Sequence, residues 1–170
     1  KTILQKEKII SIRSICSSYL PDWRKNVDYR TIYSAHKSEG GGVCIDLIHE
    51  WDYLTYLFGF PDKVFCLNGQ YSDLEIDSED IAVYIAAYKD KLLELHLDYV
   101  GRQPVRLMDV ISNQNNWKFD ILNGTINVSN DGYFITRIPY DRGYQILVDH
   151  QEVKSEVVNE AFLGCKIKKG

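Results

Sequence analysis

Alternating apolar and polar residues occupy much of this chain and predict strands. In residues 92–100 (LLELHLDYV), Leu and Tyr alternate with Glu94, His96 and Asp98, which is the period of a strand with one buried face and one solvated face. Other segments rich in β-branched and aromatic residues cover 8–20, 64–71, 81–88, 105–112 and 133–138. With the hairpin segments below, we expect about seven strands.

Two turn signals join neighbouring strands into hairpins. Lys89 and Asp90 separate residues 81–88 from 92–100, and Asn123-Gly124 separates WKFDIL from TINVS. Asn-Gly suits the positive φ angles of a type I′ turn. The strands are therefore expected to run mainly antiparallel, while the tail segment VDHQEVKSEVVNEAF (148–162) is expected to form a helix.

The pattern changes to a helical period between residues 43 and 58. Apolar residues recur there at helical spacing, at Cys44, Leu47, Ile48, Trp51, Leu54 and Phe58. Gly59 stands where a C-terminal glycine cap belongs, and Pro61 prevents continuation. One long helix and a run of strands predict an α+β fold, a predominantly antiparallel open sheet with helices packed on one face.

Composition narrows the class of protein. A chain of 170 residues, 45% of them hydrophobic, supports one core, so we expect a single domain over 1–170. The net charge of −4 and the scattered Lys and Arg residues disfavour nucleic-acid binding. The sequence has neither the apolar run of about eighteen residues that a membrane span needs nor a signal peptide.

The cysteines favour a reducing compartment. They are far apart and form no CxxC pair, which resembles neither a zinc site nor a disulfide framework: Cys16, Cys44, Cys66 and Cys165. A cytoplasmic location is therefore expected. The chain begins at Lys1 rather than Met and its single Met is Met108, so we expect a fragment excised from a longer protein.

Candidate chemistry lies at the start of the predicted helix. Asp46, His49 and Tyr53 are spaced to project from one helix face. The helix dipole favours a carboxylate in the first turn and holds a nearby histidine toward its neutral form, as a proton acceptor requires. Residues 40–42 are glycines, which allow close approach of backbone and ligand. A helix cap is the alternative role of Asp46. His36 and His150 have no partners at metal spacing, and no metal site is expected.

The segment GGGVCIDLIHEWDYLTYLFG (40–59) resembles the signature of the glucose-fructose oxidoreductase, inositol dehydrogenase and rhizopine catabolism (Gfo/Idh/MocA) family. That signature carries GGG, then an Asp, then HxxD before a helix ending in LFG. YLPDWRKNVDYR (19–30) is similar to the YLPDWRP-type stretch of a branch associated with surface-sugar biosynthesis, and DSEDIAVY and LDYVGRQPVR resemble later family segments. The resemblance runs from Ile9 to Val128.

The resemblance implies an enzyme of two domains. An N-terminal Rossmann domain would bind NAD or NADP, and the second domain would supply the sugar pocket and the oligomer contact. His49 would be the general base or acid at the sugar hydroxyl, with Asp46 beside it positioning the substrate. Asp46 and His49 are three residues apart, as in the surface-sugar branch, whereas many members of the family have four residues from the Asp to the His.

The chain lacks the nucleotide-binding features of the family. No GxGxxG follows a predicted strand, and the EKP-type lysine of the first domain is absent. We therefore expect the substrate-binding domain of an NAD(P)-dependent oxidoreductase acting on a sugar or nucleotide-sugar hydroxyl or keto group, with no cofactor binding and no activity by itself. The alternative is a non-catalytic ligand-binding or protein-assembly module of the same fold.

Several aromatic and basic side chains are candidates for the sugar pocket. Aromatic rings suit pyranose faces, and guanidinium groups suit phosphate or carboxylate groups. The candidates, for which packing in surface loops is the alternative, are Trp23, Arg24, Tyr29, Arg30, Tyr53, Arg102 and Arg106. His96 is expected on a solvated strand face. The exposed sheet face, rich in Tyr and aliphatic residues, predicts a homo-oligomer.

Overall fold

In the computed structural model, the described residues are 7–129, 132–139, 143, 145–148, 151–158 and 162–167. The chain forms two compact units, Ser11–Met108, and Lys1–Ile10 together with Asp109–Gly170. The first unit contains the glycine-led segment and is the one that positions the candidate site.

The sheet of the first unit is mixed. Its strands follow the order β2-β3-β4-β1-β5, with bounds β1 (Ile9–Tyr19), β2 (Lys63–Gly69), β3 (Ile81–Ala87), β4 (Leu92–Asp98) and β5 (Val100–Ser112). β2 pairs antiparallel with β3 and β3 with β4, which confirms the hairpin at Lys89-Asp90. β1 pairs parallel with β4, because the long connection between them allows a crossover. The predicted α+β class is confirmed.

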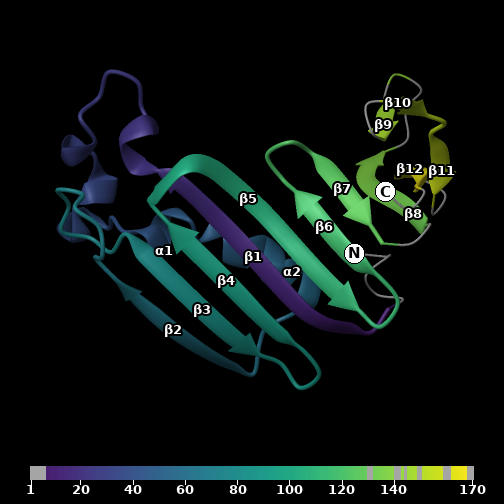
Figure 1. The fold of residues 1–170 in the computed structure, drawn as a ribbon, viewed down its shortest axis with the longest axis horizontal. Helices are drawn as coiled ribbons and strands as arrows, with labels where there is room; N and C mark the ends of the chain where they lie inside the picture. The colour runs from purple at the N-terminus through teal and green to yellow at the C-terminus, as the bar shows by residue number, and fades with distance from the viewer. Residues whose placement is uncertain are drawn as a thin grey trace. The chain divides into compact units, whose positions relative to one another are not determined.

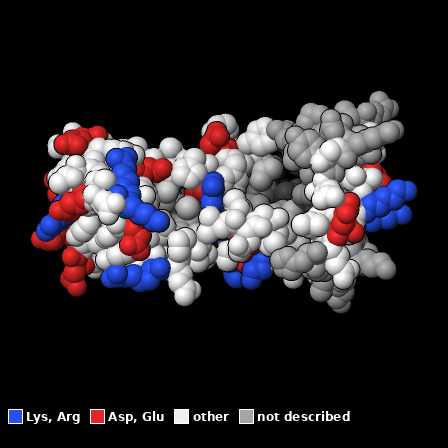
Figure 2. Space-filling view, turned by 90° about the horizontal axis from the view of Figure 1, so that it is seen from above, with Lys and Arg blue, Asp and Glu red and all other residues white. Residues whose placement is uncertain are grey.

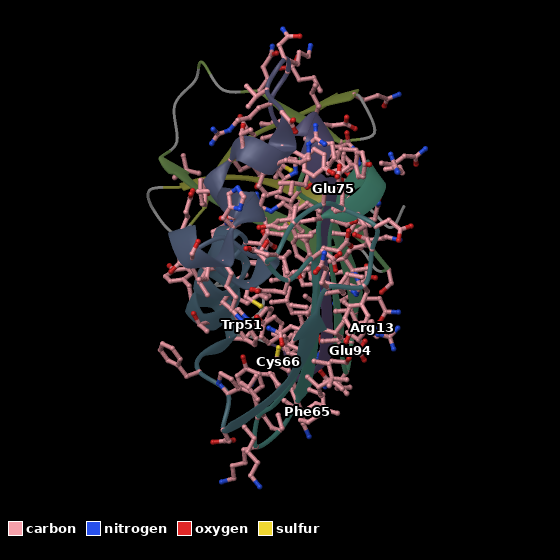
Figure 3. The ribbon with its side chains drawn as sticks, turned by 90° about the vertical axis from the view of Figure 1, so that its left-hand side faces the viewer. Arg13, Trp51, Phe65, Cys66, Glu75 and Glu94 are labelled. Atoms are coloured by element: carbon pink, nitrogen blue, oxygen red, sulfur yellow. The ribbon has the colours of Figure 1, made fainter. Side chains whose placement is uncertain are left out.

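The two faces of this sheet have different environments. On β1, Ile12, Ser14 and Cys16 are buried, and Leu93, Leu95 and Leu97 of β4 are fully buried. Both helices lie behind the sheet in Figure 1, so they cover a single face of it, as predicted. Trp51 lies on that side in Figure 3, whereas Arg13 and Glu94 lie on the other side.

The predicted long helix is two helices. α1 (Val43–Asp46) and α2 (His49–Phe58) are joined at Leu47 and Ile48. There the N–H groups of Ile48 and Glu50 bond carbonyls three residues back, of Ile45 and Leu47, rather than four. This tighter turn rotates the following residues relative to an uninterrupted helix. Ile48 is 57% exposed, so its place in the predicted apolar stripe is wrong, and Glu50 has no exposed surface.

The connection from β1 to α1 contains four short 3-10 helices. They are Leu20–Asp22, Tyr29–Thr31, Tyr33–Ala35 and Lys37–Glu39. Pro21 stands in the first turn of the first of them, where its missing N–H costs no hydrogen bond. Residues 23–28, between the first two of these helices, form a loop in which Asn26 has φ 62°.

The second unit contains short antiparallel strands. β6 (Asn116–Asp120) and β7 (Thr125–Val128) form the predicted hairpin. The predicted type I′ turn is wrong, because among the described residues only Asn26 and glycines have positive φ. Gly124 does, at 64°, while Asn123 is bonded to the side chain of Asp120.

The tail is made of strands in its described parts. β11 (Glu156–Val158), β12 (Phe162–Ile167) and β8 (Gly132–Pro139) form one sheet, and β9 (Ile146–Val148) pairs with β10 (Gln151–Val153). The helix predicted for 148–162 is therefore wrong. Val153, Val157 and Val158 are β-branched, and strand pairing satisfies their backbone groups.

Candidate functional site

The glycines before α1 allow two backbone segments to meet. A Cβ on Gly41 would overlap the carbonyl of Tyr33 and lie 2.6 Å from the carbonyl oxygen of Ser34. Gly42 has φ 123° and faces the side-chain carboxylate of Glu79. The backbone carbonyl of Glu79 accepts a hydrogen bond from the N–H of Val43 at 3.0 Å. The glycine run thus fixes where α1 begins.

Gly41→Ala is expected to destabilise the protein. The added methyl group meets backbone rather than a movable side chain, and overpacking of this kind costs about 1–3 kcal/mol or more. Chemical denaturation followed by circular dichroism measures the loss. Gly59→Ala is the control for an added methyl group in open space, although its positive φ adds strain. A Gly41→Ala variant as stable as the parent would contradict the predicted clash.

A buried carboxylate lies at the start of α2. The Oε1 atom of Glu50 is 2.7 Å from Nε of Arg106 on β5, although this N–H does not point at the oxygen and forms no hydrogen bond with it. The hydroxyl of Tyr53 donates to Oε2 of Glu50 at 2.8 Å. Since the single phenol proton is used there, Ser14 on β1 donates to the Tyr53 oxygen, also at 2.8 Å.

This network changes the ionisation of its neighbours. Burial raises the pKa of Tyr53 well above its usual range. The Glu50 carboxylate raises this pKa further, whereas the hydrogen bond with Ser14 lowers it. Burial and the Glu50 carboxylate likewise raise the pKa of the Cys16 thiol to about 12. Both groups are therefore neutral at physiological pH. The guanidinium of Arg106 is the cation that compensates Glu50, and it also lies 5.8 Å from the centre of the Tyr53 ring.

His49 lies at the solvent side of this network. Its Nε2 atom is 3.2 Å from Oε1 of Glu50, and its side chain is 48% exposed. An imidazole that touches a buried carboxylate and remains open to solvent can exchange a proton with a molecule that approaches from outside. The structure thus brings together His49, Tyr53 and Arg106 of the predicted site residues.

Asp46 has a different partner. The hydroxyl of Tyr99 donates to Oδ2 of Asp46 at 2.6 Å, and burial together with this carboxylate raises the pKa of Tyr99 far above its usual range. The ring of Tyr99 is fully buried and packs edge-on against Trp23, with 5.2 Å between ring centres. Asp46 therefore anchors α1 to the residue that follows β4.

The other predicted pocket residues are dispersed. Arg30 binds Asp28 at 2.7 Å and Glu75 at 2.9 Å, and the hydroxyl of Tyr29 accepts the N–H of Glu75. Hydrogen bonds from Arg30 hold the pKa of Asp28 below its usual range. Arg30 and Tyr29 thus tie one loop to another.

Trp23, Arg24 and Arg102 lie near the C-terminal end of β1, around the loop that follows that strand. Trp23 donates from Nε1 to Ser18 at 2.9 Å, and the guanidinium carbon of Arg102 lies 3.6 Å from the centre of the Tyr19 ring. Arg24 is exposed. These contacts are with the last residues of β1 rather than with the imidazole described above.

A second histidine–carboxylate pair lies on the face of the sheet opposite the helices, called the open face below. On β4, Nε2 of His96 is 3.0 Å from Oδ2 of buried Asp98, and the His96 side chain is 41% exposed. Burial by itself raises the pKa of Asp98, but the hydrogen bonds from His96, Ser17 and two backbone N–H groups lower it overall. This pair resembles His49–Glu50 in geometry and lies across the sheet from α2. Of the remaining histidines, His36 bonds the carbonyl of Arg30, and His150 lies outside the described residues.

Sequence reasoning missed Glu50, Ser14 and Cys16. The helical period over 43–58 places Glu50 beside solvent-facing positions, and the turn at Leu47–Ile48 moves it inward. Ser14 and Cys16 alternate with Arg13 and Ile15, a signal that shows which face they share but not what covers it.

A polar pocket of about 230 Å³ lies elsewhere in this unit, lined in part by Lys37, Gln70, Asp77 and Glu79, and His49 does not line it.

Comparison with solved structures gives the fold. An oxidoreductase from Agrobacterium radiobacter in complex with NAD+, L-tartaric acid and magnesium matches 76% of this chain and 38% of its own, with a TM-score of 0.60 and 17% identity. Levoglucosan dehydrogenase in complex with NADH and L-sorbose matches 74% of this chain and 38% of its own, with a TM-score of 0.61 and 14% identity. The chain shares its fold with part of each of these two proteins.

A third structure agrees with these two. The UDP-N-acetylglucosamine 3-dehydrogenase of Acidithiobacillus ferrooxidans matches 75% of this chain with a TM-score of 0.56 and 19% identity. The chain spans 38–39% of the length of these three proteins. The shared α+β architecture is the one that the sequence resemblance implies.

Sequence comparison adds one further match. The family described as bacterial membrane protein YfhO matches residues 102–170, which is less than half of the chain. No curated protein matches the sequence. Among the described residues, no helix has both the length and the apolar character needed to cross a membrane.

Proposed function

We propose that this chain is the substrate-binding part of an NAD(P)-dependent oxidoreductase that acts on a hydroxyl or keto group of a sugar or nucleotide sugar. The observation that carries the proposal is the half-exposed imidazole of His49, held against buried Glu50 at the start of α2, in the helical region that follows the glycines 40–42. The fold that surrounds it is shared with dehydrogenases, and the motif GGGVCIDLIHEWDYLTYLFG resembles the Gfo/Idh/MocA signature.

His49 is proposed as the proton acceptor in the oxidation direction. The hydroxyl proton of the substrate passes to the imidazole as the hydride leaves the same carbon, and the reverse transfer accompanies reduction of a keto group. The carboxylate of Glu50 lies 3.2 Å from Nε2 of His49 and orients the imidazole ring. The pairing of Glu50 with Arg106 and Tyr53 keeps this carboxylate in place during the transfer.

NAD or NADP supplies hydride acceptance and donation when bound. The sequence of this chain contains no GxGxxG motif, so the proposal assigns cofactor binding to a Rossmann domain of the intact enzyme. This chain by itself is then expected neither to bind the cofactor nor to turn over substrate. The other site residues remain proposed substrate contacts or positioning residues: Asp46, Trp23, Arg24, Tyr29, Arg30, Tyr53, Arg102 and Arg106.

Turnover of the intact enzyme tests this proposal. We expect NADH or NADPH to form when the protein is mixed with NAD(P) and a panel of sugars and UDP-sugars, and to be lost when His49 is replaced. UDP-sugars are included because a UDP-N-acetylglucosamine dehydrogenase shares the fold. An intact protein that binds NAD(P) but oxidises no member of the panel, and reduces none of the corresponding ketones, would contradict the proposal.

A homo-oligomer through the open face of the sheet is part of the same proposal. Phe65 and Leu67 on β2 and Val83 and Ile85 on β3 are exposed, and the register pairs Phe65 with Ile85 and Leu67 with Val83. Four apolar side chains thus lie side by side on the face opposite α2. Exposed patches of this kind mark interfaces between protein chains.

Phe65→Glu is expected to dissociate the oligomer. A charge placed at the centre of an apolar interface must be desolvated on association, which disfavours the assembled form. Light scattering after size-exclusion chromatography measures the molar mass. Lys89→Glu, at an exposed position in the turn between β3 and β4, is the charge control and should leave the mass unchanged. The surface would not be the interface if Phe65→Glu had the molar mass of the parent.

A cytoplasmic location also remains a proposal. All four cysteines are free thiols in the structure, two of them buried, as expected in a reducing compartment.

On the face shown in Figure 2, basic and acidic side chains are interspersed, so this face offers no continuous basic stripe for nucleic acid.

A further inference from the structure

The thiol of Cys16 belongs to the same cluster as His49 and Glu50, although the function proposed above does not use it. Cys16 Sγ, an imidazole nitrogen of His49 and a carboxylate oxygen of Glu50 all lie within 4.8 Å of one another. The three side chains come from two elements, β1 and α2. Each offers one atom that can bind a metal ion.

Burial and unsatisfied bonding set this cluster apart from a chance group of polar residues. Glu50 has no exposed side-chain surface, and its Oε1 atom accepts no hydrogen bond. Cys16 is 8% exposed, so its thiol also lies beneath the surface. Arg106 Nε lies 2.7 Å from this oxygen and His49 Nε2 lies 3.2 Å from it, but neither forms a hydrogen bond with it, so its lone pairs remain available to a metal ion.

We propose that Cys16, His49 and Glu50 form a three-ligand site for Zn²⁺ with an open fourth position. Thiolate, imidazole and carboxylate together suit Zn²⁺ and disfavour Mg²⁺ and Ca²⁺, which prefer oxygen ligands. His49 forms the exposed side of the cluster, so a water molecule or a substrate oxygen can occupy the fourth position. Binding releases the thiol proton to solvent and leaves a thiolate on the metal.

The charges around the cluster are compatible with a bound dication. Glu50 and the thiolate of Cys16 carry two negative charges, and Arg106 supplies the nearest positive charge, 2.7 Å from Glu50 Oε1. Metal binding adds the thiolate charge, which offsets the guanidinium. Tyr53 continues to donate to Oε2 of Glu50 and orients the carboxylate.

Metal binding and proton transfer compete for His49. An imidazole nitrogen that binds Zn²⁺ has no lone pair for a substrate proton, so the metal-bound form cannot use His49 as a base. The metal site is therefore a separate property of the same residues. It requires neither a nicotinamide cofactor nor a sugar, and it stands if the proposed oxidoreductase activity fails.

Cobalt titration of the purified full-length protein tests the site. Co²⁺ is the probe because a thiolate ligand gives it a charge-transfer absorption that oxygen and nitrogen ligands do not. We expect this band to appear with saturation at one equivalent, to vanish on addition of Zn²⁺, and to be absent in Cys16→Ser. Cys66→Ser, which removes an exposed thiol of β2, is the matched control and should retain the band.

His49→Gln guards against an effect of Cys16→Ser on folding, since His49 is half-exposed. Removing a residue that only hydrogen-bonds to a metal ligand weakens metal binding by about 10–100-fold. Removing the ligand His49 itself should therefore weaken Co²⁺ binding at least tenfold. Circular dichroism establishes that each variant is folded. The proposal is overturned if no charge-transfer band appears, if folded Cys16→Ser keeps it, or if His49→Gln binds Co²⁺ as tightly as the parent.

Discussion

Replacing His49 by Asn in the intact enzyme is expected to lower kcat by about 10²–10⁴-fold, the usual contribution of a positioned general base or acid. Asn is close to the imidazole in size but cannot take up a proton at neutral pH. The affinity for NAD(H) should change little, because the nucleotide is assigned to another domain. Steady-state kinetics and a fluorescence titration with NADH measure the two quantities.

The matched control is His96→Asn. His96 also lies against a buried carboxylate, at 3.0 Å compared with 3.2 Å for His49, and its exposure is similar. It lies on the opposite face of the sheet, so His96→Asn should keep kcat within about twofold, since no proton-transfer role is assigned to it. Light scattering on both variants separates an effect on chemistry from an effect on assembly.

Added imidazole provides a second readout, which a merely structural role would not move. Because the His49 side chain is half-exposed, His49→Ala leaves an opening to solvent that a free imidazole molecule can enter. We expect imidazole to restore part of the lost kcat of His49→Ala and none of any loss in His96→Ala. Equal kcat values for His49→Asn and the parent would refute the role of His49 as proton acceptor.

Arg106→Met is expected to cost about 3–5 kcal/mol of unfolding free energy, because it leaves the fully buried Glu50 carboxylate without its cation. Met has a similar stem to Arg, so the loss of packing is small by comparison. Urea denaturation monitored by circular dichroism and by tryptophan fluorescence measures the change. A loss this large approaches the whole stability of many single domains.

A double-mutant cycle assigns the effect to the ion pair. Glu50→Gln removes the negative charge while keeping the shape of the side chain, and the guanidinium that it leaves behind is partly exposed. The double variant Arg106→Met with Glu50→Gln should regain much of the stability lost in Arg106→Met, since no buried charge remains uncompensated. If Arg106→Met changes stability by less than about 0.5 kcal/mol, the pair does not stabilise the fold.

The two-residue alternation of apolar and polar residues predicted the strands correctly. In β4 the Leu residues alternate with Glu94 and His96 because one face packs against the helices and the other faces away, so burial alone produces the pattern. Lys89-Asp90 and Asn123-Gly124 predicted both hairpins, because the preference for a turn depends on the residues within the turn itself. The turn type at Asn123 was wrong because Asp120 holds that residue in another conformation.

The tail and the parallel strand pair were beyond a local reading. Residues 151–153 pair with 146–148 and residues 156–158 pair with 162–164, and β12 pairs in turn with β8, which lies outside the predicted helix. The parallel pairing of β1 with β4 joins segments separated by the whole helical region. Strand partners of this kind are selected by tertiary packing, which outweighs the weak local preference of either segment.

The sequence by itself determined the α+β class, the glycine-led start of the helical region and the candidacy of His49. Only the tertiary structure decided which carboxylate accompanies that histidine. The tight turn at Leu47–Ile48 rotates Ile48 outward and Glu50 inward, and Asp46 bonds to Tyr99 instead. Glu50 can be buried because Arg106 and Tyr53 meet it there from β5 and from its own helix. A charge tolerates burial only when such partners converge on it, and their convergence is a property of the fold rather than of any short segment.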